Sequence, residues 1–284
     1  MSPALIALFL GLGSALTLAA ANAFVKAGKD ILLSRAALSL SAAIMVLPLA
    51  FIVPLPNRET WLILAISIPS HWIYQFALIR AMHRGDLSLV FPIMRGSAPL
   101  VTALFAAFAL GEALPPLAIA GLVIASVATA VFALPEGANA AGIRKAALFW
   151  SLATGLSVAL YNVVDAFGVR AAPTAYTFIV WLFLLDWIGV NAAALYVRSG
   201  EYLSGLRQRL RYGAMAGALS VGSFGMALYG FTIAPVAYIS ALRETAVVFG
   251  ALLGWKYLKE GLGLRRTLSA LVLAGGLMML QLGG

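Results

Sequence analysis

The chain has 284 residues, of which 63% are hydrophobic and only 10% are charged, and its mean hydropathy is +1.00. Because soluble domains carry about 25% charged residues, this composition excludes an ordinary soluble protein. The net charge is +9, but no basic run interleaved with aromatics lies outside the apolar segments, which argues against a nucleic-acid partner. The absence of cysteine excludes disulfides, thiolate metal sites and cysteine nucleophiles.

Apolar stretches of about 20 residues recur along the whole chain, and each can cross a hydrocarbon core of about 30 Å. The first stretch contains TLAAANA, which resembles a signal-peptide cleavage site, but its start lacks the positive charge of a signal. We therefore predict an all-α polytopic membrane protein with no soluble domain. Its ten expected transmembrane helices are 4–25, 31–53, 59–80, 87–110, 115–134, 146–168, 174–197, 212–233, 235–258 and 264–282.

Basic residues are distributed unevenly between the two sides of these spans. Fifteen of the 19 lysines and arginines lie in or beside the joints that follow spans 1, 3, 5, 7 and 9, whereas the opposite side holds only Arg58 and Arg170. Cytoplasmic loops carry the excess of Lys and Arg, so the odd-numbered joints are predicted to be cytoplasmic and both termini to lie outside. The expected location is a bacterial-type inner membrane.

The two halves of the chain match each other when one is slid by about 140 to 150 residues. Segment 12–28 lies over 152–168, and segment 91–112 lies over 239–260. The polar pairs that coincide are Asn22 with Asn162, Arg95 with Arg243, and Glu112 with Glu260. Glu244 has no counterpart, since Gly96 fills its place. The sequence thus predicts two five-helix repeats, residues 1–137 and 138–284.

An odd number of spans in each repeat forces the second repeat to enter the membrane from the opposite side. Inverted repeats of this kind are the common construction of secondary transporters, whose substrate site lies near the midplane between the repeats. The sequence therefore favours transport by alternating access through a central cavity. Duplication that only enlarges a helical bundle is the structural alternative.

This arrangement resembles the drug/metabolite transporter superfamily, EamA type. The strongest local match is APLVTALFAAFALGE (98–112), in which Pro99 and Glu112 stand where that family usually has a proline and a glutamate. The second repeat departs from the pattern, with Val247 in place of the proline. The resemblance implies a ten-helix transporter, similar in outline to exporters of aromatic and other amino acids.

Ionisable residues inside spans are costly and usually face a cavity or a partner. Arg95, Arg243, Glu244 and Asp186 are the charged residues that lie deep in the expected spans. Arg243 and Glu244 are neighbours and point about 100° apart, so at least one of them needs a partner on another helix. Contacts of Arg243 with Asp186 or Glu244 are possible, and static pairing or snorkelling is the structural alternative.

Further cavity residues are expected around a proline in the third span. Pro69 frees backbone groups, which transporters tolerate where a helix lines a cavity, and polar and aromatic side chains follow it within two turns. These candidates are His71, Trp72, Tyr74 and Gln75. Matched asparagines and two tyrosines complete the predicted substrate-binding or gating set: Asn22, Asn162, Tyr161 and Tyr229. Helix packing is the alternative role for each, whereas Glu112 and Glu260 are expected to be solvated caps.

The leading functional hypothesis is a secondary transporter that exports amino acids or similar small zwitterionic metabolites. A transporter of a sugar, nucleobase, amine or drug is the alternative within the same class. No HExxH, GxSxG or Walker motif occurs, which argues against an embedded enzyme and ATP coupling, and a channel would not require inverted repeats. We expect no cofactor and no catalytic or metal-binding residue. The expected partners are the substrate and the lipid bilayer, around a monomer or weak dimer.

Overall fold

The structure is a computed structural model that describes residues 2–28, 30–84, 87–133, 145–250, 252 and 263–283. All regular elements within these residues are helical. In chain order they are α1 (Pro3–Ala27), α2 (Ile31–Val46), η1 (Leu47–Phe51), α3 (Arg58–Arg84), α4 (Leu87–Leu110), α5 (Pro116–Ala133), α6 (Lys145–Ala171), α7 (Ala175–Val197), α8 (Tyr202–Gly230), α9 (Val236–Arg243) and α11 (Leu264–Gly283).

Seven helical segments in the described part of the chain are long and apolar enough to cross a membrane: α1, α2 with η1, α3, α4, α6, α7 and α11. α5 is a shorter apolar helix. Large apolar side chains cover the outside of the molecule, such as Phe51, which is 87% exposed, and Phe108, which is 84% exposed. Long apolar helices with exposed apolar side chains are typical of proteins in a bilayer, so the protein is membrane-embedded.

The start of α8 differs from the prediction. The charged segment 198–211 was expected to be a joint, yet α8 begins at Tyr202, ten residues before the expected span. Its first turns are held by tertiary packing, because Tyr202 and Leu206 pack against a small cluster on α2 and α7 that includes Leu33 and Ala194. The Tyr202 hydroxyl also donates a hydrogen bond of 2.8 Å to Asn191 Oδ1.

The ninth span also differs, because it is not one continuous helix. α9 ends at Arg243, residues 244–245 form a turn, and helix resumes at residue 246. The backbone N–H groups of Glu244, Thr245 and Val247 bond to carbonyls three residues earlier, at 3.0, 3.1 and 3.2 Å. A tight turn of this type inside a helix often marks a functional hinge. The break coincides with the two adjacent charges.

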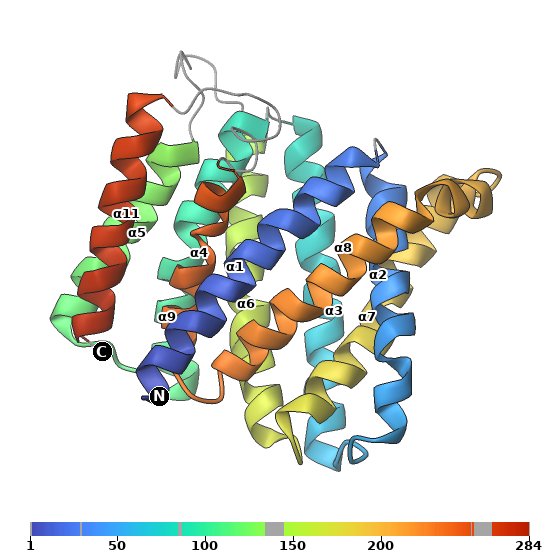
Figure 1. Ribbon diagram of the computed structural model, residues 1–284, viewed down its shortest axis with the longest axis horizontal. Coiled ribbons are helices and arrows are strands. Elements are labelled where there is room, and N and C mark those ends of the chain that lie inside the picture. The colour runs from blue at the N-terminus through green and yellow to red at the C-terminus, as the bar shows by residue number, and fades with distance from the viewer. Residues whose placement is uncertain are drawn as a thin grey trace.

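The two ends of the bundle differ in content. Figure 1 shows both chain termini at one end, together with the joints 52–57, 111–115, 172–174 and 231–235. We name this the terminal end. The opposite end carries the α1–α2 and α7–α8 joints, and Arg198 lies in the second of these joints; we name it the basic end. The joints after the first and seventh expected spans thus lie at the same end.

Helix contacts connect the two halves of the chain throughout. α3 packs on α6, α1 and α2 pack on α8, α2 and α3 pack on α7, α4 packs on α6 and α9, and α1 also contacts α9. Beside this group α5 lies along α11, side by side in Figure 1. Small residues allow that approach, since a Cβ on Gly276 would lie 2.7 Å from the backbone nitrogen of Ala125. Small residues at the interface are typical of helix packing in membranes.

Candidate functional site

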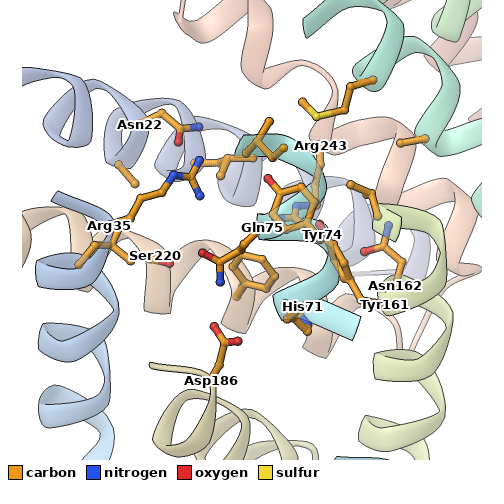
Figure 2. A pocket seen from close by; sticks show the side chains of 18 of the residues that line it. Asn22, Arg35, His71, Tyr74, Gln75, Tyr161, Asn162, Asp186, Ser220 and Arg243 are labelled. Atoms are coloured by element: carbon orange, nitrogen blue, oxygen red, sulfur yellow. The ribbon is translucent and has the colours of Figure 1, made fainter. Parts of the chain in front are cut away.

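A polar cavity of about 150 Å³ lies between α1, α2, α3, α4, α6, α7, α8 and α9 (Figure 2). Its lining on α1 comes from the second half of that helix, up to Val25, and its lining on α2 from the beginning, at Arg35 to Ser39. The cavity therefore lies in the half of the bundle nearer the basic end. Ten of the predicted residues line it: Asn22, His71, Tyr74, Gln75, Arg95, Tyr161, Asn162, Asp186, Arg243 and Glu244.

Glu244 finds its partner on α4. Its Oε1 lies 3.4 Å from Nη1 of Arg95, and the two side chains are 6% and 16% exposed. The partner is thus the arginine that aligns with Arg243 in the sequence match, and not Arg243 itself. This ion pair joins α4 to the turn that follows α9.

Arg243 is 7% exposed and faces the same cavity. Its Cζ lies 4.8 Å from the ring centroid of Phe224 on α8, a cation–π contact. Neither of the two expected partners, Asp186 and Glu244, forms an ion pair with it, and within the described residues its Nε has no hydrogen-bond partner. A buried guanidinium with an unsatisfied N–H donor is energetically unfavourable, so this position is suited to an anionic ligand group.

Asp186 on α7 presents a carboxylate at the same cavity (Figure 2). Among the described residues its Oδ1 is buried and has no hydrogen-bond partner. Its backbone carbonyl accepts a hydrogen bond of 3.2 Å from Trp72 Nε1. Since the indole of Trp72 packs against Gly189 outside the cavity, the expectation that Trp72 lines the site is wrong.

His71 belongs to a hydrogen-bonded group between α3 and α6. Its Nε2 lies 2.9 Å from Oδ2 of Asp165, and Oδ1 of Asp165 accepts a hydrogen bond from Ser67. Asp165 is fully buried, so Asp186 is not the only acid deep in the bundle besides Glu244. On the cavity side, the His71 ring stacks on Tyr161 at 4.3 Å, and Tyr74 meets Tyr161 edge-on at 5.5 Å.

Asn162 connects three helices at the cavity wall. Its Nδ2 donates to Thr102 Oγ1 on α4 at 3.5 Å and to Ser240 Oγ on α9 at 3.4 Å. Tyr229, in contrast, stacks on Tyr176 at 5.9 Å. Because Tyr229 lies one residue before the end of α8, it belongs to the terminal end and does not line the cavity. Contact of Tyr229 with this cavity is therefore not observed, and its predicted gating role stays a prediction.

Arg35, Ser220 and Phe224 are among the cavity residues that sequence reasoning missed. Arg35 was grouped with the basic joint after the first span. In Figure 2 its guanidinium points into the space between Asn22 and Gln75. Ser220 and Phe224 are spaced by one helical turn on α8 and therefore share a face, but apolar surroundings of this kind give no signal that distinguishes a cavity face from a packed one.

The terminal end is closed by polar contacts. Gly111, with a φ of 69°, ends α4 and lets the N–H of Glu112 bond back to Ala106 O at 3.2 Å. Glu112 Oε1 then pairs with Arg170, and Oε2 accepts the N–H of Val236, the first residue of α9, at 2.7 Å.

Three further contacts strengthen this closure. Arg170 Nε donates to Phe231 O at 2.8 Å, Asn57 Nδ2 to Ala171 O at 3.2 Å, and Thr177 Oγ1 to Pro54 O at 3.2 Å. Because the Glu112 side chain is only 15% exposed, its predicted role as a solvated cap is wrong. Glu260 lies outside the described residues.

No family model matches the chain, and no curated protein matches it by sequence. Among solved structures, one described only as the crystal structure of a protein superposes with a TM-score of 0.72. It is 17% identical in sequence, over 97% of this chain and 96% of the other. At that identity the likeness shows a shared fold alone.

Proposed function

We propose that this protein is a secondary transporter that exports amino acids or similar small zwitterionic metabolites by alternating access. The observation that carries the proposal is the pair of incompletely hydrogen-bonded charged groups at one cavity. Among the described residues, the buried Arg243 forms no ion pair with Asp186 or Glu244 and its Nε has no acceptor, and the buried Asp186 Oδ1 has no hydrogen-bond donor. A zwitterion would supply the missing carboxylate to Arg243 and the missing ammonium to Asp186.

The size and walls of the cavity support a small metabolite over a drug. Its volume of about 150 Å³ is below the range of about 300–1,000 Å³ that holds drug-sized ligands. Tyr74, Tyr161 and Phe224 present ring faces and edges to it. These rings can pack against an apolar or aromatic side chain while the charged groups hold the backbone of an amino acid.

The helix contacts support the inverted-repeat part of the proposal. In this comparison α1, α2, α3, α4 and α5 correspond in turn to α6, α7, α8, α9 and α11. The α3–α6 contact then has its counterpart in the α8–α1 contact. Likewise, the α2–α8 contact corresponds to α7–α3, and the α4–α6 contact corresponds to α9–α1. The α2–α7, α4–α9 and α5–α11 contacts join each helix to its own counterpart. A pseudo-two-fold axis produces this pattern, and substrate sites of such transporters lie at the repeat interface. We propose that the chain belongs to the drug/metabolite transporter superfamily, EamA type, which its sequence resembles and with which this pattern agrees.

The hydrogen bonds suggest which step of the cycle the structure represents. Polar contacts close the terminal end, whereas the cavity lies toward the basic end. With the basic end in the cytoplasm of a bacterial-type inner membrane, as the distribution of Lys and Arg favours, we infer that the structure represents an inward-facing state. The interrupted helix beside Arg243 resembles the broken helices that form substrate sites in transporters.

Counterflow in proteoliposomes tests the proposal. Vesicles are loaded with one unlabelled L-amino acid at a time from the common twenty, and entry of the same labelled amino acid is followed. We expect counterflow for at least one, and its loss in Arg243→Gln and Asp186→Asn. Matched controls are Arg198→Gln and Asp30→Asn, since Arg198 and Asp30 form a partly exposed pair at 3.4 Å and such pairs contribute little.

Two outcomes would contradict the proposal. Absence of counterflow for every amino acid would reject the substrate class, and sugars, nucleobases and amines would be tested in the same vesicles. Counterflow that survives in both cavity variants at the wild-type rate would reject the assigned residues.

A further inference from the structure

The group formed by His71, Asp165 and Ser67 is not explained by substrate contact. Asp165 is fully buried and does not line the cavity, whereas His71 is 6% exposed and does. His71 Nε2 and Asp165 Oδ2 are 2.9 Å apart, and Ser67 holds the other carboxylate oxygen. The histidine is therefore the part of this pair that a proton from the cavity can reach.

The pair can bind one additional proton at a buried position, where a net charge is energetically unfavourable. With a neutral imidazole and an ionised Asp165 it carries one negative charge, and with an imidazolium it becomes a neutral ion pair. Near neutral pH both states are accessible to an imidazole. Buried ionisable groups of this kind inside membrane proteins typically serve proton relays and ion pathways.

Other charged and titratable groups face the pair from each neighbouring helix. Tyr74 belongs to α3 and Tyr161 to α6, Asp186 to α7, and Arg243 to α9, while α8 presents the Phe224 ring at 6.0 Å from His71. Glu244 and Arg95 neutralise one another. A positive charge on His71 and a substrate ammonium group at Asp186 would thus lie at the same wall of the cavity and repel each other.

We propose that His71 and Asp165 form a proton-binding site whose occupation excludes the substrate ammonium group, so that a proton is exchanged for the substrate. This inference rests on the proposed function and adds its driving force. In the inward-facing state the proton leaves His71 for cavity water as the ammonium group arrives at Asp186. After substrate release on the other side, a proton returns to His71. Mutually exclusive binding at one cavity is what proton-coupled export requires.

Steady-state accumulation tests the coupling. Proteoliposomes with an acidic lumen, and with the membrane potential held at zero by potassium and valinomycin, are given the labelled amino acid that shows the fastest counterflow. For one exchanged proton, accumulation should reach about tenfold per pH unit, because one pH unit corresponds to a tenfold ratio. Because this ratio is a thermodynamic quantity, a slower variant reaches the same value later.

Asp165→Asn and His71→Gln are the diagnostic variants. Each should equilibrate the amino acid, with an accumulation ratio of about one at any pH gradient. Ser14→Ala is the matched control, since Ser14 is buried, bonds to Ser223 and lies outside the cavity; it should accumulate as wild type does.

The other possible results contradict either the proton site or the proposed function. Gradient-driven accumulation that persists in both variants contradicts the proton site, as does wild-type accumulation driven only by an acidic exterior. Loss of all exchange in both variants, with normal folding by circular dichroism, also contradicts it, because the pair would then serve substrate passage. Wild type without counterflow for any amino acid overturns the proposed function instead, and the coupling inference with it.

Discussion

Arg170 and Glu112 form an ion pair at the terminal end, and the second carboxylate oxygen of Glu112 holds the N-terminus of α9. Arg170 also donates to the carbonyl of Phe231 at the end of α8. Two side chains thus connect the ends of α4, α6, α8 and α9. Opening of this end in alternating access requires that these contacts break, so the pair is a candidate for the gate on that side.

Removal of the ion pair should favour opening of the terminal end. In a Ser240→Cys background, labelling of the cavity cysteine by an impermeant maleimide from that end should increase about fivefold in Glu112→Gln, since such a pair is worth about 1 kcal/mol. Glu59→Gln, an exposed acidic residue at the same end, is the matched control. Equal labelling of the two variants would exclude a gating role for Glu112.

The buried Arg95–Glu244 pair should contribute more to the stability of the fold than the Arg170–Glu112 pair does. Glu244→Gln removes the carboxylate of the buried pair, and removal of one partner of a buried pair costs about 3–5 kcal/mol. We expect a clearly lower midpoint of thermal unfolding in detergent, followed by circular dichroism. The double variant Arg95→Met with Glu244→Met should recover most of the loss, because replacement of both charges removes the desolvation cost. Failure to recover would mean that the pair does not act as a unit.

The α5–α11 contact should tolerate no side chain at Gly276. A Cβ there would lie 2.7 and 2.8 Å from backbone atoms of Ala125 and Gly121, and overpacking costs about 1–3 kcal/mol. Gly275 is the matched control, since a Cβ at that position meets nothing within 4 Å. Gly276→Ala should lower the unfolding midpoint and Gly275→Ala should not. Equal midpoints would argue against this close approach.

Single cysteines can determine the orientation, because the natural chain has none. Leu55 lies in the joint at the terminal end, and Gly200 lies in the α7–α8 joint at the basic end. With the basic end in the cytoplasm, an impermeant maleimide should label Leu55→Cys in intact cells and Gly200→Cys only in inverted vesicles. The reverse pattern would show that the distribution of Lys and Arg misleads here.

Most helix positions could be predicted from the sequence because the length of an apolar stretch is a local property. The two departures arise from tertiary contacts. Arg207, Arg209 and Arg211 made the start of α8 resemble a joint, but Tyr202 and Leu206 pack against α2 and α7 and extend the helix. The interruption of the helix at Glu244 was not expected either. Glu244 pairs there with Arg95, which lies 149 positions away in the sequence.

The site was recognisable where polar residues are unusual in their surroundings. Arg243, Asp186 and His71 stand out in apolar spans, and all three line the cavity. Their partners were not predictable, since pairing depends on which helices become neighbours. Asp165 appeared to lie near the end of its span, yet α6 continues to Ala171 and places it beside His71, 94 positions earlier in the sequence. The prediction that Trp72 lines the cavity was wrong, because helical spacing alone does not identify which face of α3 meets α7.

The short α9 has a mechanical consequence. It contains eight residues and is thus about 12 Å long, with Val236 attached to Glu112 at one end and Arg243 at the other. The turn at 244–245, with its hydrogen bonds to carbonyls three residues earlier, separates it from the helix that resumes at residue 246. A short helix moves as a rigid unit, so a ligand that shifts the backbone of Arg243 would also shift Val236. Ligand binding at Arg243 would then be transmitted through α9 to the hydrogen bond between Val236 and Glu112 that helps to close the terminal end.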